Sequence, residues 1–396
     1  MPERECTQLC ATLSARGRPA LHDLAKLAII GSRGFPSTYG GYETLVRYLA
    51  RHMVRAGHEV TVYCRARDEN RRIWITEGVR CVATPGRDTK TLSTLSFGLT
   101  SIADASFRRF DAALVLNIAN GFWVPALRAA RIPFAVNTDG IEWEREKWNA
   151  AGKAAFKAGA HMTAKTAPAL VCDSEAIGAI WKDLFGRSSV FIPYGGDVVE
   201  TPGRDRLDAV GFDDTPYILV VARLAPENNV ELTLDAVERL NGERMKTVIV
   251  GSANFDSPIE HRLKALAKSG AVTWLGHVDD QRLLTQLWAN SAAYIHGHSV
   301  GGTNPALLQA LGAGAPTLAL DTPYSREVLS ADDQLFPHDA EALAERIRGV
   351  IQDANLQEVM RKRGRKIIQE RYTWQDVCER YTDLLVTLAE GRPVPL

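Results

Sequence analysis

The sequence predicts an α/β protein built from two doubly wound domains that face each other across a cleft. Three observations support this prediction. Short apolar stretches alternate with longer helix-like stretches along the chain, which is typical of parallel sheets joined by crossover helices. The length of 396 residues is too great for one ordinary core. A polar segment without periodicity, residues 201–215, separates the alternation into two sets.

Each set of apolar stretches can form its own sheet. In the first half we expect strands at Leu27–Ile30, Glu59–Cys64, Ala112–Leu116, Phe134–Asn137, Leu170–Cys172 and Val190–Ile192. In the second half we expect strands at Tyr217–Ala222, Thr247–Val250, Val272–Leu275, Ala293–Ile295 and Thr317–Leu320. Ligands of such sheets bind beyond the carboxyl ends of the strands, so two facing domains place the binding site in the cleft between them.

The same pattern predicts how the chain is divided. We expect a poorly ordered extension over residues 1–24, a first domain over 25–200, a linker over 201–215 and a second domain over 216–372. The last segment, 373–396, contains an amphipathic stretch that is expected to pack back towards the first domain. The first 24 residues contain no apolar core of a secretory signal.

Composition is that of a soluble globular protein, with 45% hydrophobic and 24% charged residues. The six cysteines form no C-x-x-C pair, which favours a reducing cytoplasm over a zinc ribbon or a disulfide framework. No apolar run is long enough to span a membrane. The 47 Lys and Arg residues balance 47 Asp and Glu residues, and we expect no nucleic-acid partner. Residues 1–200 hold 26 basic and 20 acidic residues, which indicates either an anionic partner or ordinary variation of surface charge.

Paired glycines precede a helix-like stretch in the first half. Gly40 and Gly41 follow the first expected strand and open a helix over about residues 42–55. The spacing does not match the G-x-G-x-x-G dinucleotide fingerprint. Free backbone N–H groups and the positive end of the helix dipole favour an anion there, although an ordinary strand-to-helix turn would also use these glycines.

The second half repeats this arrangement. Arg223 follows the first strand of that half, and Gly301 and Gly302 follow its fourth strand. Asn304 is a good helix N-cap, and Pro305 suits the first helical position. The glycines would let the backbone approach a ligand closely, with the amides of Thr303 and Asn304 directed at it. Two such helix starts and an arginine across a cleft suit a diphosphate.

The other charged residues and possible metal ligands support weaker predictions. His296 and His298 could share a strand face as metal ligands, but no third ligand has a suggestive spacing, so pocket-lining or core histidines are favoured. No D-x-D motif is present. A face formed by Lys153, Lys157, His161 and Lys165 could meet an anionic membrane surface or acceptor, or could simply be solvated.

Several motifs together resemble a known family. The stretches IIGSRGFPSTYGGYET, NTDGIEWEREKW, CDSEAI, VVARLAPENN and SVGGTNPALLQALGAGAPTLALDTPYSREVL resemble the bacterial rhamnosyltransferase-type branch of glycosyltransferase family four, over about residues 27–388. The resemblance implies two Rossmann-like domains in the GT-B glycosyltransferase fold. It also implies a nucleotide-sugar donor held mainly by the second domain, an acceptor held mainly by the first, and metal-independent transfer with retention of configuration.

The sequence departs from the wider family at two pairs of positions. Most members carry two glutamates where this chain has Gly301 and Gln309; the first commonly contacts the sugar and the second the ribose. Where most members carry an arginine and a lysine, this chain has Arg223 and Asn228, so the diphosphate site has one cation fewer. The branch that the chain resembles shares this asparagine and the SVGGTNP run, so these departures do not indicate an inactive protein.

The resemblance and the spacing together give a set of candidate site residues. Arg223, the Gly41 amide and the Gly302–Asn304 amides are expected to stabilise charge on the leaving diphosphate. Asp139 is the candidate for orienting the acceptor or stabilising the sugar cation, and a capping role is its alternative. The further donor-side candidates are Gly40, Asn228, His298, Ser299, Gly301, Thr303 and Gln309, and the acceptor-side candidates are Glu142 and Trp143.

The leading hypothesis is a cytoplasmic enzyme of polysaccharide biosynthesis. It would move a hexosyl group, rhamnosyl from dTDP-rhamnose in the first instance, onto a glycan, a lipid-linked or a small-molecule acceptor, without a metal or other cofactor. It could also contact the inner membrane face peripherally. Two alternatives stay open: a nucleotide-sugar epimerase of similar two-domain fold, and a non-catalytic sugar-nucleotide-binding protein.

Overall fold

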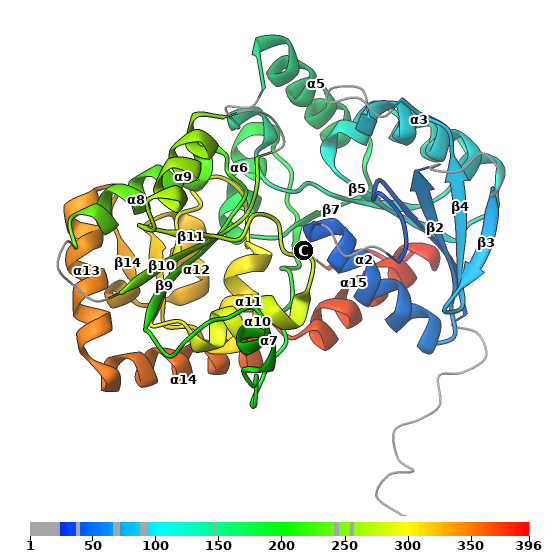
Figure 1. Cartoon of the computed structure of the whole chain (residues 1–396). Helices are drawn as coiled ribbons and strands as arrows, with labels where there is room; N and C mark the ends of the chain where they lie inside the picture. The colour runs from blue at the N-terminus through cyan, green and yellow to red at the C-terminus, as the bar shows by residue number, and fades with distance from the viewer. Residues whose placement is uncertain are drawn as a thin grey trace, which may run out of the picture.

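The computed structural model describes residues 24–36, 40–65, 72–87, 93–145, 148–240, 245–253 and 257–395. The described chain forms two sheets, each covered by helices, and the two halves lie side by side (Figure 1). The predicted α/β architecture with two doubly wound domains is therefore confirmed. Buried aliphatic residues fill both faces of each sheet, as expected for parallel strands that are covered on both sides.

The first sheet has eight strands in the order β3-β4-β2-β1-β5-β6-β7-β8. Their bounds are β1 Lys26–Ile30, β2 Glu59–Arg65, β3 Ile73–Thr76, β4 Val79–Thr84, β5 Ala112–Leu116, β6 Phe134–Asn137, β7 Ala169–Cys172 and β8 Val190–Phe191. The helical segments are α2 Gly41–Arg55, α3 Ser93–Phe107, η1 Ile118–Phe122, α4 Val124–Ala129, η2 Glu142–Glu144, α5 Ala150–Thr166 and α6 Glu175–Phe185. All neighbouring strands are parallel except β3 and β4.

The second sheet has six parallel strands in the order β11-β10-β9-β12-β13-β14. Their bounds are β9 Tyr217–Val221, β10 Lys246–Val250, β11 Thr273–Trp274, β12 Ala293–His296, β13 Thr317–Leu320 and β14 Leu335–Phe336. The helical segments are η3 Pro226–Asn228, α8 Val230–Glu238, α9 Pro258–Lys268, α10 Gln281–Asn290, α11 Pro305–Ala313, α12 Pro323–Leu329, η4 Asp332–Gln334, α13 Ala340–Gln352 and α14 Ala354–Arg371.

Three strands were not predicted from the sequence. The β3–β4 pair is an antiparallel addition at the edge of the first sheet, and β3 has exposed and half-buried residues in alternation. Strand β14 has two residues. The short β14 and the half-exposed β3 give too few apolar positions to be recognised by periodicity, whereas β4 has six residues, five of them buried, and was overlooked.

The segment 201–215, which we expected to be the linker between the domains, packs onto the second domain in the structure. It contains helix α7 (Asp205–Ala209), whose Leu207 is fully buried. Gln286 of α10 has no exposed surface, and its side chain accepts hydrogen bonds from the Arg206 and Leu207 amides at 2.8 and 3.3 Å. Helix α7 is held by one buried leucine and a network of polar contacts. Because it therefore has no apolar periodicity, it could not be recognised from the sequence.

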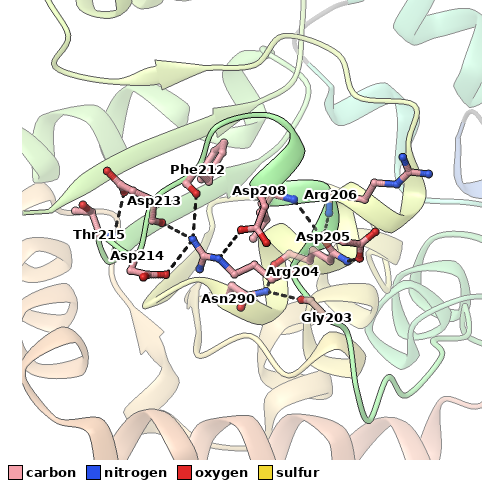
Figure 2. Close-up of polar contacts among 12 residues, drawn as sticks. Gly203, Arg204, Asp205, Arg206, Asp208, Phe212, Asp213, Asp214, Thr215 and Asn290 are labelled. Atoms are coloured by element: carbon pink, nitrogen blue, oxygen red, sulfur yellow. Dashed lines mark hydrogen bonds and ion pairs between the residues drawn. The ribbon is translucent and has the colours of Figure 1, made fainter.

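Arg204 organises the rest of this segment (Figure 2). Its guanidinium binds Asp208 at 2.9 Å, the Phe212 and Asp213 carbonyls at 3.2 and 2.5 Å, and Asp214 at 3.3 Å. Asn290 of α10 donates to the Gly203 carbonyl at 3.2 Å. Residues 203–215 therefore belong structurally to the second domain.

The chain passes between the domains at two points that lie next to each other. Gly196 forms a parallel bridge with Thr373, and its amide donates to the Tyr372 carbonyl at 2.7 Å. Helix α15 (Trp374–Ala389) then packs against α2, β5 and β6 of the first domain (Figure 1). Its first residue stacks on Tyr48 of α2, with ring centroids 4.3 Å apart.

Candidate active site

The two glycine-rich helix starts predicted from the sequence meet where the domains touch. Helix α2 begins at Gly41, and α11 begins at Pro305. A Cβ atom on Gly41 would lie 3.3 Å from Pro305 Cγ of the second domain and 3.3 Å from the Tyr194 hydroxyl. The two helix N-termini therefore face each other at the carboxyl ends of both sheets.

The N-terminus of α11 is capped by the side chain of Asn304, the residue that precedes the helix. The Asn304 side-chain oxygen accepts a hydrogen bond from the Ala306 amide at 2.9 Å, and Pro305 occupies the first turn, as the sequence predicted. The hydroxyl of the buried Thr303 donates to the carbonyl of Asp173 in the first domain. The turn before α11 is thus fixed on both sides.

The structure gives Gly301 and Gly302 different reasons to be glycine. Gly301 has a φ of +128°, which favours glycine for backbone reasons. No such φ occurs at Gly302, but a Cβ atom there would lie 1.9 Å from Asp173 Oδ1. We expected both glycines to admit a diphosphate; the close approach seen at Gly302 is made by a carboxyl group of the other domain.

The start of α2 differs from that of α11. Gly40, the N-cap residue, has a φ of +114° and offers no side-chain cap. Glu43 in the first turn is buried and accepts the Arg33 amide at 3.0 Å. Its other oxygen lies 2.5 Å from where a Cβ on Gly40 would be. Glu43 was missed from the sequence, although an acidic residue in the first helical turn was a usable signal.

Arg223 lies just beyond the carboxyl end of β9, where it was expected, and its side chain is exposed. Asn228, by contrast, is 3% exposed, and its side-chain amide donates to the Arg223 carbonyl at 2.8 Å. We expected Asn228 at the position of a diphosphate ligand; its side-chain nitrogen is instead used to hold the backbone turn that presents Arg223.

His298 and Ser299 extend from the carboxyl end of β12. The rings of His296 and His298 stack, with centroids 4.2 Å apart. Burial lowers the pKa of His296 to about 3. It also lowers the pKa of His298 well below its ordinary value, assisted by His296 and by the positive charges of Arg223 and Arg145. Both rings are therefore neutral near pH 7. Ser299 binds the Glu227 carbonyl through its amide and its hydroxyl, each at 2.9 Å.

The acceptor-side candidates lie in the first domain after β6. The amide of Asp139, a residue with a φ of +57°, donates to Asn137 Oδ1 at 2.9 Å. Glu142 is buried and accepts the Trp148 indole N–H at 2.9 Å. Trp143 packs edge-on against Phe185 in the core. We expected Trp143 to face an acceptor; the structure buries its ring in the first domain.

Arg145 was not among the site residues predicted from the sequence. It is buried, and its Nε lies 2.5 Å from Glu142 Oε1 in an ion pair without hydrogen-bond geometry. Its Nη1 lies 3.7 Å from Glu227 Oε1 of the second domain. Arg145 thus carries a positive charge to the boundary between the domains, beside Gly301.

Asp173 was also missed. It follows β7 in the CDSEAI stretch, for which the sequence suggested no role. Burial raises the pKa of Asp173 well above its ordinary value, and the nearby charge of Asp139 adds to the rise. The CDSEAI stretch was a usable signal, because it puts an acidic residue at the carboxyl end of a parallel strand.

The remaining candidates lie at the edges of this region. Gln309 is partly exposed on α11. Lys157 and Lys165 are exposed and Lys153 is partly exposed on α5, which stands at the rim of the first domain (Figure 1). Within the described ranges, no group of three His, Cys, Asp or Glu residues is placed to hold a metal ion. No helix in the described part of the chain is long and apolar enough to cross a membrane.

Comparison with known proteins agrees with this geometry. The family model described as Glycosyltransferase Family 4 matches residues 39–198, and the model described as Glycosyl transferases group 1 matches residues 205–367. A GDP-mannose-dependent monoacylated alpha-(1-6)-phosphatidylinositol monomannoside mannosyltransferase of Corynebacterium glutamicum is 25% identical over 224 residues. That match covers 52% of this chain and 58% of the relative, which is less than two thirds of the relative's length.

Solved structures share the fold over nearly the whole chain. Sucrose-phosphate synthase from Thermosynechococcus elongatus has a TM-score of 0.76 at 17% identity, covering 93% of this chain and all of that one. Anabaena HepE in complex with UDP-glucose has a TM-score of 0.72 at 15% identity, covering 91% of this chain and 99% of that one. Identity at this level shows a common fold.

The class of protein follows from these matches and from the two facing domains. The chain has the fold of the GT-B glycosyltransferases, and each of its two domains matches a glycosyltransferase family model. The Family 4 model falls on the first domain and the group 1 model falls on the second.

Proposed function

We propose that the chain moves a hexosyl group from a nucleoside-diphosphate sugar to a hydroxyl group of a glycan, a glycolipid or another acceptor. We further propose that the group is rhamnosyl, that the donor is dTDP-rhamnose, and that transfer retains the anomeric configuration without a metal ion. The observation that supports this most directly is the meeting of the α2 and α11 N-termini across the domain boundary.

The electrostatics of this region suit a leaving diphosphate. The backbone amides of Gly302, Thr303 and Asn304 lie in the turn before α11, next to the positive end of the helix dipole, and Arg223 adds a full positive charge that solvent can reach. Hydrogen-bond donors that are already oriented towards the developing negative charge lower the activation barrier of the transfer most. Similar structures support the same ligand class: Anabaena HepE is in complex with UDP-glucose, and the trehalose-6-phosphate protein from E. coli is bound with UDP-2-fluoro glucose.

The donor can be identified by thermal shift with dTDP, UDP and GDP and with a sugar conjugate of each. A ligand at about 100 times its Kd adds about 2.7 kcal/mol of stability to the protein that binds it. Stabilisation by dTDP compounds above the other two is expected. A clear preference for UDP or GDP would exclude the rhamnosyl assignment and leave the glycosyltransferase class intact.

Turnover with donor alone separates the alternatives. A transferase consumes donor productively only when an acceptor hydroxyl is present, whereas a nucleotide-sugar epimerase forms its product without one. A non-catalytic binding protein would bind the donor but would not convert it, either with an acceptor or without one. The anomeric coupling in the product's NMR spectrum reports retention, and unchanged turnover in EDTA is expected if Arg223 and the backbone amides replace a metal ion.

Peripheral contact with an anionic membrane is a separate part of the proposal. The exposed Lys157 and Lys165 lie on α5 together with the partly exposed Lys153. Sedimentation with vesicles containing an anionic lipid should carry the protein down at low salt. Charge reversal of the two exposed lysines should abolish this binding and leave donor binding unchanged.

A further inference from the structure

The Asp173–Ala176 segment of the first domain is held against the second domain at two places. The Thr303 hydroxyl donates to the Asp173 carbonyl. The Glu327 carboxylate of α12 accepts the Ser174 hydroxyl at 2.8 Å, and it accepts the Glu175 and Ala176 amides at 3.0 and 3.4 Å. Glu327 therefore satisfies the first amides of α6 from the other domain. These contacts fix the backbone at Asp173.

The carboxyl group of Asp173 lacks a hydrogen bond that it needs. The residue is 2% exposed, and its Oδ1 is buried without a hydrogen-bond partner in the described part of the chain. Burial of an oxygen without a partner is unfavourable, so such groups are uncommon in folded proteins. Neither of the two docking contacts uses the carboxyl group itself. A ligand that donates a hydrogen bond would complete this environment.

The position of this oxygen indicates which part of a donor substrate would reach it. Oδ1 lies beside Gly302, in the turn whose following amides are the expected diphosphate ligands. The transferred sugar is bonded to the outer phosphate, so a diphosphate at these amides brings the sugar ring close to Asp173. Gly301 and Gly302 offer no side chains there, so the nearest carboxyl group comes from the first domain.

We propose that Asp173 is a specificity-determining residue whose carboxyl group accepts a hydrogen bond from a hydroxyl group of the transferred sugar. This inference rests on the proposed function, because it needs a nucleoside-diphosphate sugar in the site. It differs from a diphosphate contact in one measurable respect. A residue that reads the sugar contributes to binding of the nucleotide sugar and contributes nothing to binding of the bare nucleoside diphosphate.

The test compares the two ligands on the same variants by titration calorimetry. Wild-type protein, Asp173→Asn and Asp173→Ala are titrated with dTDP and dTDP-rhamnose, with UDP and UDP-glucose, and with GDP and GDP-mannose. Glu175→Gln is the matched control, since it removes an exposed carboxylate two positions away on the same docked segment. For the nucleotide that the wild type prefers, Asp173→Ala should bind the diphosphate within twofold of wild type and the nucleotide sugar at least tenfold more weakly. Glu175→Gln should match the wild type with both ligands.

Each other outcome overturns the inference. Equal weakening of both ligands in Asp173→Ala would place the carboxyl group at the diphosphate or at the domain contact. Unchanged affinity for both would leave it no role in donor binding. A wild type that binds none of the three pairs would overturn the proposed function and this inference together. Folding is checked by the melting temperature, which should equal or exceed that of wild type in Asp173→Ala, because the buried oxygen without a partner is gone.

Discussion

The starts of α2 and α11 use similar sequences for different structures. Both follow a parallel strand and a pair of glycines, and both point at the domain boundary. At α11 the cap is Asn304, and the glycines lie in the turn before it. At α2 the cap position is Gly40 itself, without a side chain, and Glu43 binds the Arg33 amide. The comparison teaches that a pair of glycines marks a place where other atoms come close to the backbone, and that the neighbouring side chains decide which atoms these are.

The largest expected effect tests whether the α11 side carries the diphosphate charge. Arg223→Ala should cost about 2–4 kcal/mol of transition-state stabilisation, as loss of one oriented donor does elsewhere. The measurement is kcat/KM for the donor. Arg239→Ala is the matched control, because Arg239 is an exposed arginine of the same domain whose ion pair with Glu341 lies on the surface. Wild-type activity in Arg223→Ala would move the diphosphate site away from β9.

The two glycines before α11 should respond differently to the same substitution. Gly301→Ala strains the backbone at a φ of +128°, at a cost of about 1–3 kcal/mol, whichever residue stands at position 173. Gly302→Ala should destabilise only when Asp173 is present, because the three atoms that a new Cβ would meet all belong to that side chain.

Denaturant unfolding of each alanine variant, alone and combined with Asp173→Ala, measures this coupling. Additive losses for Gly302→Ala would show that something other than Asp173 demands a glycine there.

A smaller effect distinguishes the capped helix start from the uncapped one. Asn304→Ala should cost about 0.5–2 kcal/mol of stability, because the Ala306 amide loses its acceptor. Ser257→Ala removes an equivalent cap from α9 in the same domain and serves as the control. The two variants should lose similar stability, measured by chemical unfolding. Only Asn304→Ala should also weaken donor binding, and equal donor affinity in both would separate the cap from the site.

The smallest effect lies in the segment 201–215, away from both helix starts. A hydrogen bond from Lys246 holds the pKa of Asp213 at about 2, below its ordinary value of 3.8. Because the folded pKa is lowered, the stabilisation is present above about pH 4 and is lost as the pH falls towards 2. Asp213→Asn should flatten this part of the pH dependence of unfolding. An unchanged profile would mean that Lys246 contributes nothing measurable at this exposed site.

Much of the fold could be predicted because it depends on local pattern. Continuous apolar strands such as Ala112–Leu116 and Phe134–Asn137 have the predicted bounds. The Asn304 cap and the Pro305 helix start could be predicted from these two adjacent residues alone. What could not be read depends on contacts between distant residues. Thr303 and Asp173 are 130 positions apart, and Glu327 and Ser174 are 153 apart. No local periodicity links such pairs, so the contacts that Asp173 and Glu327 make between the domains were found only in three dimensions.

The return of α15 to the first domain sets an order of events during synthesis. The Asn137 side chain donates to the Tyr381 hydroxyl at 2.6 Å, which closes a loop of 244 residues around the whole second domain. A ribosome that has made the first sheet has not yet made the helix that covers β5 and β6. Until that helix emerges, the apolar face it covers stays exposed, and contacts this distant in the chain form slowly. The first domain is therefore complete only after the last helix of the chain has been made.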